Sequence, residues 1–228
     1  MQTTHKERFN WLILIASVFV TCLIIANIIA VKLVNIWGLI VPAAVIIFPI
    51  SYIFGDILTE VYGYKTSRKV IWLGFFCNLL AVIAIWIGQM LPSASFWDAQ
   101  SSYERILGFA PRLLFASLIA YLLGEFTNSF VLAKLKIATN GRWLWLRTIS
   151  STLAGEGLDS VVFITIAFVG TIPSEGLLSA VLTQWIFKVG YEVAVTPLTY
   201  WIVNFLKRQE GLDAYDRDTN FNPLVLTD

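Results

Sequence analysis

The chain has 228 residues, of which 57% are hydrophobic and only 14% charged, with a formal net charge of +1. Soluble domains carry roughly a quarter charged residues, so this composition excludes an ordinary water-soluble protein. The near-zero charge balance also argues against a nucleic-acid partner, because phosphate binding needs a clustered excess of lysine and arginine.

Six apolar segments follow one another along the chain, each long enough to cross a bilayer as a helix of roughly 20 residues. The first is too long for the apolar part of a cleaved signal peptide, so we expect it to be retained as a span. We therefore predict an all-α fold with about six transmembrane helices in a single domain, residues 1–228. The segments are 10–34, 39–60, 70–91, 112–135, 146–170 and 177–206.

The connections between the segments are short, apart from residues 92–111, where Trp97 and Tyr103 predict an amphipathic turn at the membrane surface. From about residue 207 the chain becomes polar, which predicts a solvated tail. Prolines inside a span kink the helix or free backbone carbonyl groups. We expect such kinks at Pro42, Pro49 and Pro197.

Lysine and arginine residues gather in alternate connections. Short loops rich in these residues stay on the cytoplasmic side of a membrane. The pattern predicts that both the N- and C-termini are cytoplasmic, and it requires an even number of spans. The clusters are Lys6 and Arg8; Lys65, Arg68 and Lys69; Lys134, Lys136, Arg142 and Arg147; and Lys207, Arg208 and Arg217.

Acidic residues interrupt four of the six segments. A charge near the middle of a bilayer costs at least about 2.5 kcal/mol, so each acid needs a partner or a function. The cations Lys32 and Lys188 are too few to neutralise them. We expect Glu60, near the end of its segment, to be solvated or paired with Lys65. The six acids are Asp56, Glu60, Glu125, Glu156, Asp159 and Glu192.

Helical spacing places these polar groups on shared faces, because residues three or four apart lie on the same side of a helix. A pocket between helices, lined by carboxylates, amides, tyrosines and one lysine, is typical of a transporter for a polar solute. A structural alternative is that Lys188 and Glu192, four residues apart, neutralise each other. The candidate substrate-binding residues are Tyr52, Asp56, Glu125, Asn128, Glu156, Asp159, Gln184, Lys188, Tyr191 and Glu192.

Two short stretches of sequence echo one another on consecutive segments. Because consecutive spans run antiparallel, we expect these two polar patches to face each other in the middle of the membrane. The glycine before each acid allows a neighbouring helix to approach closely, and Gly55 before Asp56 does the same. The stretches are Gly124-Glu125-x-x-Asn128-Ser129 and Gly155-Glu156-x-x-Asp159-Ser160.

Signals for enzyme chemistry are missing from the sequence. It contains no H-E-x-x-H, G-x-S-x-G or C-x-x-C motif and no phosphate-binding G-x-x-x-x-G-K-[ST] loop. We therefore expect no catalytic residue, metal or cofactor. An aspartyl-type pair formed by Glu156 and Asp159, and a cation pore lined by carboxylates, are alternatives of lower weight.

Four motifs, in order, resemble the queuosine precursor transporter family, and the resemblance covers nearly the whole chain. It implies a bacterial inner-membrane transporter that imports 7-cyano-7-deazaguanine, and its aminomethyl relative as a further substrate. The alternative is a substrate-binding membrane subunit for another vitamin or nucleobase, working with a separate ATPase. The motifs are Phe48-Pro49-x-x-Tyr52-x-x-x-Asp56-x-x-x-Glu60-x-Tyr62-Gly63, GEFTNS at 124–129, GEGLDS at 155–160, and Lys188-x-Gly190-Tyr191-Glu192-x-x-x-Thr196-Pro197.

The implied substrate suits the polar residues. A deazaguanine presents two donors, N1–H and the 2-amino group, beside an acceptor oxygen, and a carboxylate can accept from both donors. Donors for the ring oxygen and aromatic rings for stacking are also present. The carboxylate candidates are Glu125, Glu156 and Asp159; the donors are Lys188, Asn128 and Gln184; the rings are Tyr52 and Tyr191.

Overall fold

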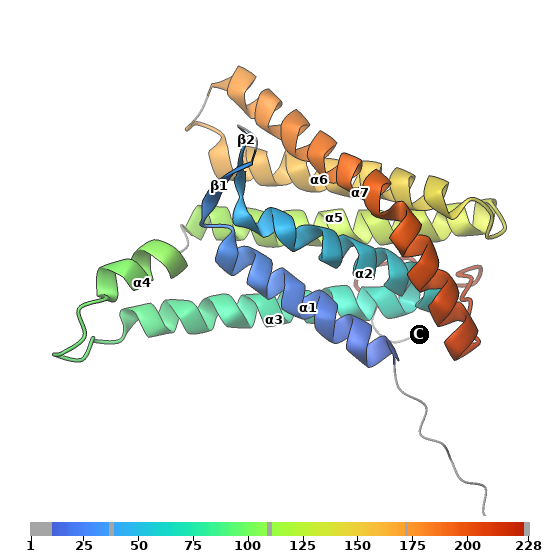
Figure 1. The fold of residues 1–228 in the computed structure, drawn as a ribbon, viewed down its shortest axis with the longest axis horizontal. Helices are drawn as coiled ribbons and strands as arrows, with labels where there is room; N and C mark the ends of the chain where they lie inside the picture. Colours follow the sequence, from blue (N-terminus) through green and yellow to red (C-terminus); the bar gives the residue numbers. More distant parts are fainter. Residues whose placement is uncertain (1–10, 37–38, 109–110, 172, 226–228) are drawn as a thin grey trace, which may run out of the picture.

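The computed structural model describes residues 11–36, 39–108, 111–171 and 173–225 (Figure 1). Two of the cations used for the orientation prediction, Lys6 and Arg8, lie outside these residues. The described chain is almost entirely helical, with one small hairpin of two strands. The elements are α1 (Trp11–Ile29), β1 (Leu33–Ile36), β2 (Leu39–Pro42), the 3₁₀ helix η1 (Ala43–Ile46), α2 (Phe48–Tyr62), α3 (Tyr64–Met90), α4 (Gln100–Leu107), α5 (Pro111–Ala138), α6 (Leu144–Phe168) and α7 (Ser174–Glu210).

Four of the six expected spans are, among the described residues, helices long and apolar enough to cross a membrane. They correspond to α1, α3, α5 and α6. The other two fall short for different reasons: α2 has only 15 residues, and α7 carries Lys188 and Glu192 near its middle. The prediction of an all-α, multi-pass membrane protein is confirmed. In place of the amphipathic turn expected in residues 92–111, the structure has the helix α4, which contains Tyr103 and begins after Trp97.

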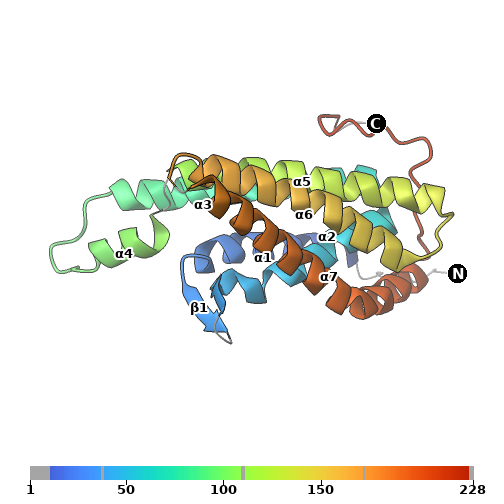
Figure 2. The same ribbon diagram turned by 90° about the horizontal axis from the view of Figure 1, so that it is seen from above.

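The second predicted span begins differently from the expectation. Residues 33–36 and 39–42 pair as antiparallel strands in which Leu33 lies opposite Pro42, and α2 starts only at Phe48. Pro42 ends the strand and Pro49 occupies the first turn of α2, where a missing N–H is tolerated. The predicted kinks at these two prolines are therefore wrong. Pro197 does lie inside α7, and Figure 2 shows this long helix bending along its length.

The helices pack as an antiparallel bundle around α2 and α5. The most extensive contact joins α5 to α6, α7 packs on α6 and α2, and α1 packs on α2 and α3. Phe19 on α1 and Ile57 on α2 are fully buried at the centre of the apolar core. A single residue, Gly63, links α2 to α3 with φ of +82°, a conformation that side chains strongly disfavour.

The predicted basic clusters from residue 65 onward lie at one end of the bundle, on the side where α2 meets α3 and α5 meets α6 (Figure 1). The C-terminal tail also lies there and differs from the expected solvated end. Asp216 in this tail is only 5% exposed and accepts a hydrogen bond of 2.9 Å from the Tyr64 backbone N–H. Arg68 donates to the carbonyl oxygens of Asn220 and Asn222 at 2.7 and 2.8 Å. The tail is thus bound to the start of α3.

Candidate functional site

The candidate site is built on the close contact between α5 and α6. A Cβ atom on Gly124 would lie 2.8 Å from the Cβ of Asp159, and one on Gly155 would lie 2.7 Å from the Cβ of Asn128. The glycine of each repeated stretch therefore packs against the fourth residue after the glycine of the other stretch. The expectation that the two polar patches face each other is confirmed.

Lys188 of α7 lies against two carboxylates of α6. Its Nζ atom is 2.7 Å from Glu156 Oε2, an ion-pair distance without hydrogen-bond alignment, and it donates a short hydrogen bond to Asp159 Oδ2. The alternative in which Glu192 neutralises Lys188 is not what the structure has. The ammonium group also lies 5.8 Å from the centre of the Tyr52 ring, and Tyr52 is close enough to Glu156 for the two groups to interact electrostatically.

Asp56 and Asn128 join α2 to α5. Asn128 Nδ2 donates to Asp56 Oδ1 at 2.7 Å, whereas Asp56 Oδ2 and Asn128 Oδ1 have no hydrogen-bond partner among the described residues. Glu192 of α7 lies near this pair and is only 1% exposed. Neither of its carboxylate oxygens has a hydrogen-bond partner in the described part of the chain. Buried polar atoms are normally paired, so these unpaired acceptors mark a place where donors are missing.

Glu125 completes the cluster and differs from the other acids. Its carboxylate lies beside Gly55, where a Cβ would be 3.3 Å from Oε2, and is close enough to interact electrostatically with Tyr52 and Asp56. Glu125 is 7% exposed and takes part in no ion pair or hydrogen bond with a described residue. Its carboxylate oxygens are therefore available to accept hydrogen bonds from a substrate.

Eight of the ten candidate residues thus come together between α2, α5, α6 and α7. The remaining two, Gln184 and Tyr191, lie on α7 within a turn of Lys188 and are half-buried. Neither takes part in the hydrogen bonds or ion pairs of the described residues. The site has acids on four helices and one lysine, an arrangement that fits a polar solute carrying several hydrogen-bond donors.

A family model described as "Putative vitamin uptake transporter" matches residues 42–202, a stretch that includes the eight clustered residues. The chain belongs to this vitamin uptake transporter family. It is 29% identical over 177 residues to the "Probable queuosine precursor transporter" of Bacillus subtilis, with 77% of each chain covered. It is 25% identical over 191 residues to the "Queuosine precursor transporter" of Escherichia coli, with 82% of each chain covered. No solved structure matches the chain.

The transporter has a second cluster of buried charge, which sequence reasoning missed, at the end where the tail lies. Glu60 is fully buried and accepts from Arg147 Nη2 at 2.8 Å and from Lys207 Nζ at 2.7 Å. Lys136 donates to the Glu60 carbonyl oxygen and to Asp213 Oδ1, both at 2.5 Å. The expectation that Glu60 is solvated is wrong.

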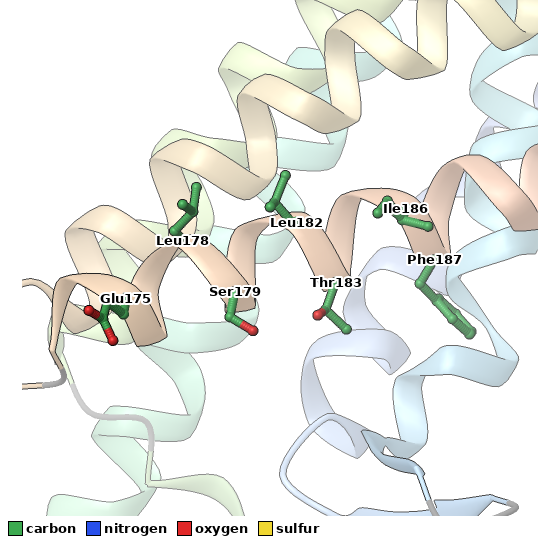
Figure 3. Close-up of a pocket in the computed structure, with 7 residues that line it drawn as sticks. All are labelled: Glu175, Leu178, Ser179, Leu182, Thr183, Ile186 and Phe187. Carbon is green, nitrogen blue, oxygen red and sulfur yellow. The ribbon is translucent and has the colours of Figure 1, made fainter.

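A hollow on the surface of the transporter lies apart from the polar cluster. It is an open groove of about 620 Å³, and the residues that line it all belong to the first half of α7 (Figure 3). Most of its lining surface is apolar, so it suits a polar solute less well than the buried cluster does. Its lining residues are Glu175, Leu178, Ser179, Leu182, Thr183, Ile186 and Phe187.

Proposed function

We propose that this transporter imports a 7-deazaguanine precursor of queuosine, such as 7-cyano-7-deazaguanine, into the cytoplasm. One observation carries the proposal: Glu125 is held in the buried polar cluster without an ion-pair or hydrogen-bond partner among the described residues. The names of the bacterial relatives support the same class of substrate.

Recognition follows from the edge of the heterocycle. The Glu125 carboxylate accepts from N1–H and the 2-amino group in a charge-assisted pair of hydrogen bonds. Lys188 has three N–H donors, of which one is hydrogen-bonded to Asp159, and Glu156 lies at ion-pair distance without hydrogen-bond alignment, so a further N–H can reach the ring oxygen. Tyr52 offers an aromatic face next to that ammonium group. Adenine lacks the donor pair and would leave a buried carboxylate unsatisfied.

Within this proposal Glu156 and Asp159 act on the substrate through Lys188. Because both carboxylates form ion pairs with the same ammonium group, the two acids fix the position of that group relative to the substrate. This role differs from the sequence-based expectation, in which either acid accepts the donors of the substrate itself. Glu125 is left as the acid available for that task.

The experiment is growth of a bacterial strain that cannot make the precursor, with and without this gene, at low external 7-cyano-7-deazaguanine. Queuosine in the tRNA is then measured. We expect queuosine only in cells that carry the gene. Glu125→Gln is expected to remove it, because the amide presents N–H groups to the donors of the substrate, at a cost of about 1–3 kcal/mol, or roughly 5- to 150-fold in affinity.

Glu175→Gln provides a matched control, because this acid lines the open groove on α7 and lies outside the polar cluster. It should leave queuosine at the wild-type level. Wild-type queuosine in Glu125→Gln cells, with equal amounts of protein in the membrane, would contradict the proposed site.

A second candidate function is suggested by the family description, which speaks of vitamins in general. In that case the chain is the substrate-binding subunit of an uptake system for another vitamin or nucleobase, driven by a separate ATPase. Purified protein in liposomes without ATP separates the two functions. Uptake of labelled 7-cyano-7-deazaguanine supports the first, and uptake that appears only after an ATPase module is added supports the second.

A further inference from the structure

Two buried acids of the cluster, Asp56 and Glu192, make no contact with the substrate in the proposed binding mode. Each is only 1% exposed. Glu192 has two carboxylate oxygens without a hydrogen-bond partner among the described residues, and Asp56 has one. An ionised carboxylate in such surroundings has a large desolvation penalty, and among the described residues only the hydrogen bond from Asn128 to Asp56 offsets it.

The charged groups that face this pair are nearly all acidic. Asp56 is close enough to Glu192, Glu125 and Glu60 to interact electrostatically with each of them. Glu192 faces Asp56 and Glu156. Lys188 lies one turn away on the same helix as Glu192, but its ammonium group is bound by the two acids of α6.

Neighbouring carboxylates without a cation cannot both remain ionised, and they share a proton instead. A metal ion would be the other way to neutralise them. Among the described residues, however, no group of three or more histidine, cysteine, aspartate or glutamate side chains is arranged to hold one. A proton needs only one carboxylate oxygen, and several unpaired oxygens are present here.

We propose that Asp56 and Glu192 together bind one proton, and that this proton crosses the membrane with the substrate. The inference rests on the proposed function. A carboxylate of the pair takes a proton from the side of higher proton activity and becomes a carboxylic acid. It releases the proton on the other side, and no bond in the substrate forms or breaks.

The architecture connects this proton site to the substrate site through two helices. On α7, Lys188 and Glu192 are one turn apart, and on α2, Tyr52 and Asp56 are one turn apart. A movement of either helix therefore carries a substrate contact and a proton ligand together. Asn128 adds a direct link, because it holds Asp56 and lies one turn from Glu125 on α5.

The test uses purified full-length protein in liposomes, with labelled 7-cyano-7-deazaguanine as the substrate and a pH-sensitive dye inside. The membrane potential is clamped and a pH gradient, alkaline inside, is imposed. We expect the wild-type protein to accumulate substrate several-fold above the external concentration. Addition of substrate should also acidify the interior by about one proton per molecule taken up.

Glu192→Gln and Asp56→Asn are expected to abolish accumulation driven by the pH gradient. Exchange of labelled for unlabelled substrate across the same membranes, which needs no net proton movement, should continue. Glu175→Gln, the same substitution earlier on α7, should behave like the wild type. Removing a buried charge is not expected to prevent folding, and gel filtration in detergent checks this.

The outcomes separate the two proposals. If the wild-type protein neither takes up nor exchanges the substrate, the proposed function is wrong. If it exchanges the substrate but a pH gradient drives no accumulation, or if a sodium gradient drives it instead, the proton site is wrong. The dye measurement on wild-type protein decides this even if both variants fail to fold.

Discussion

Lys188 is the residue that joins α7 to α6 within the site. It belongs to α7, but its ion pairs are with Glu156 and Asp159 on α6, 32 and 29 positions earlier in the chain. Its side chain is 10% exposed, and those of its partners are 8% and 19% exposed. Because these charges are shielded from water, removal of one partner leaves an uncompensated buried charge and strongly destabilises the folded protein.

At this scale we predict that Lys188→Met destabilises the folded protein by about 3–5 kcal/mol, because two carboxylates lose their cation in a buried place. Thermal unfolding of the purified protein in detergent measures the effect. The triple variant Lys188→Met, Glu156→Gln and Asp159→Asn removes all three charges and should recover most of the stability. If Lys188→Met unfolds at the wild-type temperature, the ion pairs contribute nothing to the fold.

At the scale of elements, α5 and α6 form the most closely packed pair of helices. The reciprocal packing of Gly124 on Asp159 and of Gly155 on Asn128 relates the two antiparallel helices by an approximate twofold rotation. The rotation equates Glu125 with Glu156, yet only Glu156 has a cation among the described residues. The asymmetry comes from α7, whose Lys188 pairs with the acids of α6 and not with Glu125.

We predict that Gly155→Ala forces the two helices apart, because the added Cβ would meet the backbone carbonyl oxygen of Gly124 at 2.8 Å as well as the Asn128 side chain. Lower stability and weaker substrate binding should both follow, measured by thermal unfolding and by equilibrium binding. Gly190→Ala is the matched control, since open space surrounds Gly190 within its helix. That substitution should be neutral or stabilising by roughly 0.5–1 kcal/mol. Equal behaviour of the two variants would contradict a tight α5–α6 contact.

The tail is the element for which a pH dependence can be derived. Partial burial raises the pKa of Asp213, but hydrogen bonds and charge from Lys136 and Lys207 outweigh this and lower it below its ordinary value. A carboxyl group with a lowered pKa in the folded state stabilises that state above the ordinary pKa, near 4, and this stabilisation is lost as pH falls through the lowered value. The tail should therefore loosen at pH values below about 4.

A fluorophore on a cysteine placed at the exposed residue Asp218 measures this, because its anisotropy falls when the tail becomes mobile. Asp213→Asn should already lower the anisotropy at pH 7, since an amide is a weaker partner for two lysines than a carboxylate is. An anisotropy that is unchanged in this variant would show that other contacts alone hold the tail.

Particular residues show how far the sequence could lead. The apolar segments of α1, α3, α5 and α6 have one interpretation, because only a helix hides its backbone from lipid over such a length. Residues 33–42 are rich in valine and isoleucine, and a short apolar run of this kind suits a strand as well as a helix. Glu60 pairs with Arg147, which lies 87 positions later in the chain, and no local spacing in the sequence indicates such a pair. Lys188 likewise forms its ion pairs with Glu156 and Asp159 on another helix and not with Glu192, which is four residues away on its own helix.

At the scale of the whole molecule, the basic clusters from residue 65 onward gather at one end (Figure 1). From these loop charges we predict that this end lies on the cytoplasmic side of the membrane. After replacement of Cys22 and Cys77, single cysteines at Arg142 and at Ser101 test it. A membrane-impermeant maleimide should modify Ser101→Cys in intact cells, and Arg142→Cys only after permeabilisation. The reverse pattern would invert the orientation.

The buried charge cluster around Glu60 also has a consequence for how the protein is made. Translation proceeds from the N-terminus, so Glu60 leaves the ribosome long before Lys207, which lies 147 positions later and completes its set of partners. Until the last residues are synthesised, the bundle carries an unfinished cluster of charge at one end. Chains that stop early, by a nonsense codon or by proteolysis, keep that defect permanently. We expect such chains to be removed by membrane proteases even though nearly every apolar helix is present.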